Sequence, residues 1–265
     1  MPIDLKVSVP IAYIIKPAIW AYKKANNFHL KYIQRLTYFF EEYVRQVTIY
    51  QNGHGIIYNK FVTHVLNKEK FTSFNRFIDI HDSCVDTKFG TIDEMKEVNA
   101  VDRFSKMGFW YEPHDLINNI VSIVNEPKRL EWEFFFNKTE ISNMNPPIFD
   151  ISYSMSIPGM FPITDCCFDS FKAPSSDNTC RSSSAVLHKI NKLTFIIAIE
   201  KGIDIEQYPT CKLFSHGTDQ GEYKEIKLDD DSDIFYNRYK GIIKNPKMGA
   251  TTAVEWKVRR ESKKQ

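Results

Sequence analysis

The sequence predicts a mostly β protein: an antiparallel β-sandwich, or a barrel, with an N-terminal amphipathic helical segment and one or two short inserted helices. The segment 149–157 reads F-D-I-S-Y-S-M-S-I, a strict alternation of large apolar and small polar side chains. Such alternation is typical of a strand with one face on a core and the other in water. The pattern recurs along most of the chain after residue 45, with few helical patterns between, which favours a sandwich or barrel over a βαβ fold.

Residues 1–46 are predicted to form a helical arm before a β-domain of residues 47–265. Pro17 suits the first turn of a helix, because it fixes φ and lacks an amide hydrogen. From there to about Gln46, apolar side chains recur at three- and four-residue intervals among charged ones, which indicates one apolar helix face. The apolar residues in the second part of this segment are Ile33, Leu36, Phe40 and Tyr43.

Turn-forming residues separate the predicted strands. Asn52-Gly53 supplies the positive φ angles of a tight turn, which predicts a hairpin between residues 47–51 and 56–66. The segment 245–249 reads N-P-K-M-G and is interpreted as the loop of a second hairpin. The other predicted strands are 74–80, 130–136, 148–157, 184–190, 192–200, 210–215, 222–228, 235–244 and 251–260.

Two insertions interrupt the predicted strands, around residues 83–126 and 164–184. The first contains a candidate short helix at 94–104 and helical spacing at 115–125, ended by Pro127. The second is rich in Ser, Asp and Asn and is too long for a tight connection, which is typical of a functional or disordered loop.

Strict alternation also predicts which side chains line the core, because a strand's inward residues are two apart. We expect one core that includes Trp132, Phe134, Ile151, Tyr153, Ile197, Val254 and Trp256.

The composition excludes several classes of protein. The 35 basic and 33 acidic residues give a net charge of +2, so no specific signal points to nucleic acid. The five cysteines are odd in number and irregularly spaced, a poor framework for a secreted disulfide fold, which favours the cytoplasm. No glycine-rich nucleotide loop, G-x-S-x-G or H-E-x-x-H motif is present, and we expect no cofactor.

One group of polar residues resembles a catalytic set: Asp79, His81, Asp82 and Cys84, at the end of a predicted strand. Cys84 would be the nucleophile and His81 its base. Residues three apart at a strand end rarely bring a thiol and an imidazole into contact, so a solvated strand end is the preferred interpretation. A hydrolase whose site combines His81, Asp79 and Asp82 with the distant His54 and His64 is the alternative.

A second group resembles a metal site. Cys166, Cys180 and His188 are ligand types that zinc prefers. Zinc ligands usually come in pairs two to four residues apart, and these three residues do not follow that spacing. We therefore predict reduced, metal-free cysteines, with these residues as the alternative ligand set.

Basic and aromatic side chains mix in the predicted helical arm, as in helices that lie on membrane surfaces or dock on partners. The candidate docking residues are Trp20, Lys23, Lys24, Lys31 and Arg35. A helix that simply covers a core has the same pattern, so lipid, partner and sheet stay open as its target.

The sequence therefore predicts a non-enzymatic, cytoplasmic β-sandwich module for recognition or assembly. It would bind a small ligand or a protein partner through its loops and use the helical arm for docking or self-association. The alternatives are the hydrolase with distant His and Asp residues and a protein peripheral to a membrane.

Overall fold

The computed structural model describes residues 37–83, 88–99, 103, 107–161, 179–215 and 222–259, and this part of the chain is mostly β, as predicted. Its strands are β1 (Tyr38–Ile49), β2 (Gly55–Val65), β3 (Ser73–Ser83), β4 (Lys88–Thr91), β5 (Gly108–Tyr111), β6 (Ile117–Phe136), β7 (Ile148–Ile157), β8 (Thr179–Ala185), β9 (Ile190–Glu200), β10 (Ile205–Phe214), β11 (Tyr223–Ile226), β12 (Asp229–Asp230), β13 (Tyr236–Lys244) and β14 (Thr251–Val258). Two short helices are described: α2 (Ile92–Glu97), which overlaps the helix predicted at 94–104, and α4 (Lys138–Asn143), which lies outside both predicted insertions.

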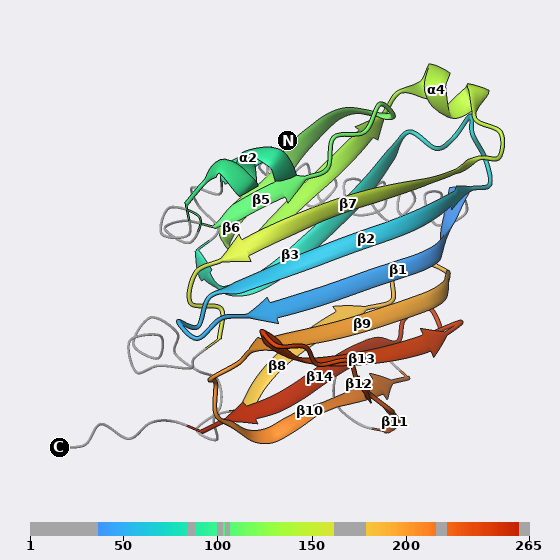
Figure 1. The fold of residues 1–265 in the computed structure, drawn as a ribbon. Helices are drawn as coiled ribbons and strands as arrows, with labels where there is room; N and C mark the ends of the chain where they lie inside the picture. The colour runs from blue at the N-terminus through green and yellow to red at the C-terminus, as the bar shows by residue number, and fades with distance from the viewer. Residues whose placement is uncertain are drawn as a thin grey trace, which may run out of the picture.

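The centre of the molecule is an eight-stranded sheet with the strand order β12-β13-β9-β1-β2-β7-β5-β4 (Figure 1). Most neighbours are antiparallel, whereas β1 runs parallel to β9 and β4 runs parallel to β5. A four-stranded sheet, β11-β10-β14-β8, and the pair β3-β6 form two smaller sheets.

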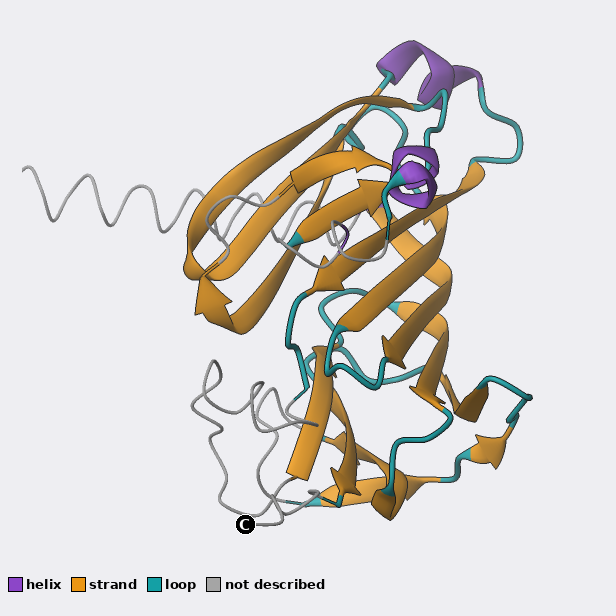
Figure 2. Cartoon of the chain, turned by 60° about the vertical axis from the view of Figure 1, so that its left-hand side comes forward, coloured by secondary structure: helices purple, strands orange, loops and turns teal. Residues whose placement is uncertain are grey.

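Both smaller sheets cover the same face of the large sheet, called here its inner face. Phe61 of β2 packs against Phe74 of β3, with ring centroids 5.2 Å apart. Tyr43 of β1 stacks on Phe61 at 4.4 Å and also contacts Ser184 of β8. Figure 2 shows the pair β3-β6 and the four-stranded sheet beside one another against the large sheet. The two covering sheets therefore meet over β1, along a line called here the seam.

The prediction of a helix up to residue 46 is wrong for residues 38–46, because these residues belong to strand β1. A β-bulge shifts the register between Phe40 and Glu42, so Phe40 and Tyr43 face the same side although they are three residues apart. Both rings contact Phe61 on the inner face. The bulge thus imitates helical spacing in a segment whose β-branched and aromatic residues favour a strand.

The helix predicted at 115–125 is also wrong, because strand β6 begins at Ile117. Isoleucine and valine are stiff at χ1 and favour strands, and Asn118 and Asn119 are poor helix formers. The strand predicted at 184–190 lies earlier, since β8 ends at Ala185 and begins inside the predicted insertion 164–184. The loop 245–249 does not close a hairpin: β13 pairs with β9, whereas β14 pairs with β10 and β8.

The predicted core is confirmed. All seven expected side chains are at most 2% exposed and belong to one continuous cluster. They come from all three sheets: Trp132 and Phe134 from β6, Ile151 and Tyr153 from β7, Ile197 from β9, and Val254 and Trp256 from β14. The hairpin turn at Asn52-Gly53 is confirmed as well, with Gly53 at φ +78°.

Candidate functional site

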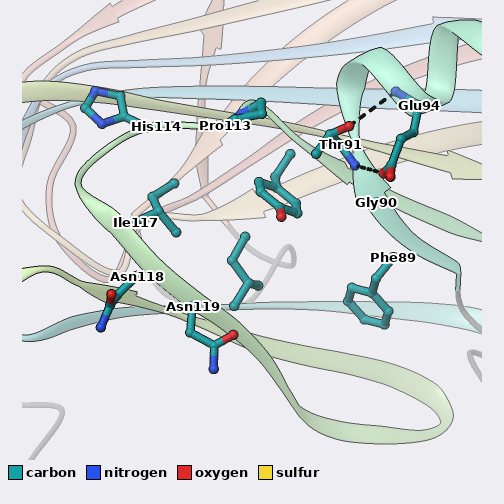
Figure 3. Close-up of a pocket in the computed structure, with 11 residues that line it drawn as sticks. Phe89, Gly90, Thr91, Glu94, Pro113, His114, Ile117, Asn118 and Asn119 are labelled. Atoms are coloured by element: carbon teal, nitrogen blue, oxygen red, sulfur yellow. Dashed lines mark hydrogen bonds between the residues drawn. The ribbon is translucent and has the colours of Figure 1, made fainter.

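A cleft of about 590 Å³ lies at the β4 end of the large sheet. Phe89 of β4 and Ile117 of β6 lie on opposite sides of it (Figure 3). Phe89 is 41% exposed, although its ring packs on Phe109 of β5 at 5.5 Å. The cleft therefore continues the aromatic core out to the surface. Its lining residues are Phe89, Gly90, Thr91, Glu94, Tyr111, Pro113, His114, Ile117, Asn118, Asn119 and Ile120.

One wall is fixed by the start of helix α2. The Thr91 side chain accepts a hydrogen bond from the Glu94 amide at 3.2 Å, and the Glu94 carboxylate accepts one from the Thr91 amide at 2.5 Å. This capping box satisfies two backbone donors at the helix terminus. A Cβ at Gly90 would lie 2.5 Å from the Glu94 carboxylate, so glycine lets the helix fold back over the strand.

The other wall comes from the segment that leads into β6. The Leu116 amide donates to Nδ1 of His114 at 3.1 Å, which leaves Nε2 as the donor of a neutral ring. Asn118 and Asn119 add amide groups beside Ile117 (Figure 3), and Ile120 also lines the cleft. Each amide offers both hydrogen-bond donors and an acceptor. The wall is thus apolar with neutral polar groups.

The carboxylate and the imidazole that line this cleft are both engaged in hydrogen bonds. Its carboxylate, Glu94, is held in the capping box, and Nδ1 of His114 is occupied by a backbone amide. General acid–base catalysis needs such groups within reach of a reacting atom and free to exchange a proton. Aromatic faces, branched aliphatic side chains and neutral amides are the usual lining of a ligand pocket.

Charged residues lie nearby on the opposite, outer face of the large sheet. Lys60 of β2 and Asp150 of β7 form an ion pair of 2.8 Å. The hydrogen bond from Lys60 holds the pKa of Asp150 below its usual value, and His114 acts in the same direction. Ser152 donates a short hydrogen bond to the Glu112 carboxylate. The outer face beside the cleft thus carries the carboxylates of Asp150 and Glu112 and the ammonium group of Lys60.

The structure places the candidate catalytic residues only in part. Asp79, His81 and Asp82 lie in the second half of β3, where Asp79 pairs in register with Arg129, and Cys84 lies outside the described residues. His54 and His64 stand at opposite ends of β2, on the order of 30 Å apart at the usual rise per residue. His54 Nδ1 accepts from the Gly159 amide at 2.8 Å, and His64 faces Glu41 at 3.2 Å. The two histidines therefore do not converge.

The proposed metal ligands are also separated. Cys180 starts β8 opposite Trp256, whereas His188 follows the other end of β8, at least roughly 16 Å away along the strand. His188 is 8% exposed and stacks on Tyr38 at 4.9 Å. Cys166 lies outside the described residues. Among the described residues, no three His, Cys, Asp or Glu side chains gather closely enough to hold a metal ion.

Two of the cysteines are described, Cys180 and Cys211, and both are buried free thiols. Burial raises the pKa of each to about 12, because a thiolate is poorly solvated in the core. At neutral pH these thiols are protonated and unreactive.

The candidate docking residues Trp20, Lys23, Lys24, Lys31 and Arg35 all lie outside the described residues. The helices that the structure does describe are too short to span a bilayer.

Sequence reasoning missed the cleft. Its residues come from three separate segments, 89–94, 111–114 and 117–120. The apolar residues of the last segment were assigned to a helix face, and the two adjacent asparagines were the available signal against that assignment.

Comparison with known proteins adds only distant structural likenesses. No family model matches the chain, and no curated protein matches it. A protein of Parabacteroides distasonis described as a candidate protease has a TM-score of 0.44 at 10% identity, over 83% of this chain and 40% of that one. Leukotriene A4 hydrolase from Saccharomyces cerevisiae has a TM-score of 0.33 at 13% identity, over 83% of this chain and 29% of that one. The folded domain of LppM from Mycobacterium tuberculosis has a TM-score of 0.28 at 8% identity, over 84% of this chain and 91% of that one.

The chain spans less than half the length of the first two of these proteins. All three TM-scores are below 0.5, so none of these likenesses carries an argument about the function of this chain.

Proposed function

We propose that the protein is a non-enzymatic β-sandwich recognition module that holds an apolar or aromatic group of its ligand in the cleft between β4 and β6. The observation that supports this most is the cleft itself, which has about 590 Å³ of space between Phe89 and Ile117. This volume lies within the range of small-molecule sites. It is enough for a substituted aromatic ring.

The polar groups of the cleft would set the orientation of the bound group. Asn118, Asn119 and Nε2 of His114 are neutral donors and acceptors beside an apolar wall. A ligand group with a ring and one hydroxyl or amide would satisfy both parts, whereas a charged group would lack a counter-ion. A protein partner can present such a group as a tyrosine side chain, and a small molecule as a phenol.

Docking or self-association through residues 1–36, and a cytoplasmic location, belong to this proposal on sequence grounds alone. Basic and aromatic residues between Trp20 and Arg35 suit a partner surface or anionic lipid.

The proposal is tested with p-cresol and toluene as probes, titrated into the full chain and followed by ligand-observed saturation-transfer NMR. We expect p-cresol to bind saturably in the millimolar range, as befits a ligand of about eight heavy atoms, and more tightly than toluene. The Ile117→Trp variant fills the cleft and should abolish binding.

The matched control is Ile234→Trp, at a side chain that is 82% exposed on the turn between β12 and β13. This variant should bind p-cresol as the unaltered protein does. The proposal fails if p-cresol does not bind saturably up to about 20 mM, or if the two variants respond alike.

A further inference from the structure

Two arginines approach each other at the seam, where the two covering sheets meet over β1. Arg45 of β1 is in hydrogen-bonding contact with the Tyr43 hydroxyl. Arg76 reaches the same tyrosine from β3, with its guanidinium carbon 5.4 Å from the Tyr43 ring centroid. It also lies 4.8 Å from the Phe61 centroid and 5.8 Å from that of Phe74. Two positive charges thus converge on one buried phenol.

Arg45 belongs to a row of polar side chains that crosses the inner face from strand to strand. Strand register aligns Arg45 with Asn59 of β2, Asn59 with Tyr153 of β7, and Tyr153 with Tyr111 of β5. Asn59 is fully buried and accepts a hydrogen bond from the Tyr43 hydroxyl at 2.9 Å. Tyr153 is in hydrogen-bonding contact with Arg76. Three strand spacings, roughly 14 Å, separate Arg45 from Tyr111 at the cleft.

The two guanidinium groups have no acidic partner in the described part of the chain. None of the ion pairs found there includes Arg45 or Arg76. The buried Nε atoms of both arginines and the buried Nδ2 of Asn59 lack a hydrogen-bond acceptor among these residues. Three donors are therefore unsatisfied within one small region. Buried charge without a partner is costly, so such a group calls for an anion.

The two arginines also act to lower the pKa of the neighbouring tyrosine hydroxyl groups. Burial raises the pKa of Tyr43, but Arg45 and Arg76 outweigh it and leave the pKa below its usual value. For Tyr153 burial dominates over Arg76 and raises the pKa to about 12. With its pKa at about 12, Tyr153 is protonated at neutral pH and does not neutralise Arg76.

Both arginines as whole residues remain partly exposed, although their Nε atoms are buried. Solvent therefore reaches part of each side chain.

We propose that the seam between β1, β2 and β3 binds a small oxyanion, the phosphate or carboxylate of a ligand, between the guanidinium groups of Arg45 and Arg76 and the amide of Asn59. A guanidinium presents parallel N–H groups that match two oxygens of either anion. Asn59 Nδ2 supplies a third donor from the floor of the site.

The test is isothermal titration of the full chain at pH 7 with inorganic phosphate and, separately, with acetate, at constant ionic strength set by sodium chloride. We expect saturable binding of at least one anion at one site per chain. Tighter binding of phosphate would identify a phosphate-bearing ligand, and tighter binding of acetate a carboxylate-bearing one. Arg45→Met and Arg76→Met should each weaken binding at least tenfold, because each removes half of the charge.

Arg259→Met is the matched control, because Arg259 is an exposed arginine paired with Asp204 at 3.3 Å, and its replacement removes the same charge from the surface. The affinity of this variant should stay within twofold of that of the unaltered protein. If a methionine variant does not fold, Arg76→Lys keeps the charge and loses the planar fork, and it too should weaken binding.

Two outcomes would overturn the proposal. One is the absence of saturable binding of either anion to the unaltered protein. The other is an equal affinity of the seam variants and Arg259→Met, which would show binding by general surface charge. Neither outcome affects the cleft, which is probed with uncharged molecules.

Discussion

The two halves of the core are built from different side chains. Under β3 and β6 the core consists mostly of rings, called here the aromatic half: Phe61, Phe74, Phe109, Trp132, Phe134 and Tyr153. Under β8, β10 and β14 it is mostly branched aliphatic around the rings of Trp256 and Phe195, called here the aliphatic half: Leu193, Ile197, Ile199, Val254 and Val258. Both halves belong to one cluster on one face of the large sheet.

Both candidate sites lie beside the aromatic half rather than the aliphatic half. Rings in the aromatic half pack at centroid distances such as 4.8 Å for Phe109 and Trp132 and 5.2 Å for Phe109 and Tyr153, in tilted and stacked pairs. Such flat groups need specific relative orientations. The cleft at β4 and the arginines at the seam lie at the two ends of this half. Branched aliphatic side chains interdigitate more freely and fill a space evenly.

The largest expected effects come from removing the indole of each half. Trp132→Ala and Trp256→Ala should each lower the free energy of unfolding by about 3–5 kcal/mol, because both side chains are fully buried. Trp132 should lie at the upper end of the range, since its ring contacts Phe109 at 4.8 Å and Tyr153 at 5.3 Å, whereas Trp256 contacts Phe161 at 5.1 Å.

Urea unfolding measures both losses. Trp132→Phe and Trp256→Phe are the controls, because they keep a ring and remove an indole N–H that lacks a partner among the described residues. They should cost less than about 1.5 kcal/mol. A larger loss for Trp256→Ala than for Trp132→Ala would contradict the greater role given to rings in the aromatic half.

The two halves were also unequally predictable from the sequence. Alternation identified core residues in both, from Trp132 to Trp256, because burial on a strand depends only on the two-residue period. The two-residue period did not identify β1 as a strand, because one extra residue at the bulge puts Phe40 and Tyr43 on the same face. The start of β6 at Ile117–Ile120 was also assigned to a helix, because its two isoleucines are three residues apart.

The candidate sites depend on register, which no single segment contains. Arg45 and Arg76 are 31 positions apart in the sequence and meet only because β1 and β3 lie in facing sheets. Asn59 joins them through its pairing with Arg45. Each of these residues by itself looks like an ordinary polar position of an alternating strand. Only the pairing of the strands shows that they point into the core.

A smaller effect is expected at the seam that joins the two halves. Tyr43→Phe removes the hydroxyl that donates to Asn59 Oδ1 at 2.9 Å and leaves a fully buried amide without this partner. The free energy of unfolding should fall by about 1–3 kcal/mol. Tyr58→Phe, on the outer face of β2, is the control and should change it by less than about 0.5 kcal/mol.

The loss from Tyr43→Phe should depend on pH. The pKa of Tyr43 is lowered in the folded state, so its ionisation favours the folded state above that pKa, and the gain is complete above the unfolded value near 10. The difference in stability between the unaltered protein and the Tyr43→Phe variant should therefore grow as pH rises toward 10. Unfolding curves at several pH values measure this, and a difference that shrinks with pH would show that burial outweighs the two arginines.

The smallest effect is expected on the outer face, away from both halves of the core. The Lys60 and Asp150 side chains are 40% and 50% exposed, so water screens their ion pair. Lys60→Met should lower the free energy of unfolding by about 0.2–1 kcal/mol. Lys244→Met, an exposed position of β13, is the control and should have no comparable effect.

The contribution of this ion pair should be constant at intermediate pH and fall at both extremes. The pKa of Asp150 is lowered by Lys60, so the contribution is complete above the unfolded value near 4 and is lost as pH falls through the folded value. The pKa of Lys60 is raised by Asp150, so the contribution is lost again only as pH rises above about 10.4. Urea unfolding at acidic, neutral and alkaline pH should give the largest difference between the unaltered protein and Lys60→Met at neutral pH. A difference that exceeds the loss from Tyr43→Phe would mean that exposed charge on the outer face, rather than the buried seam, holds β2 in place.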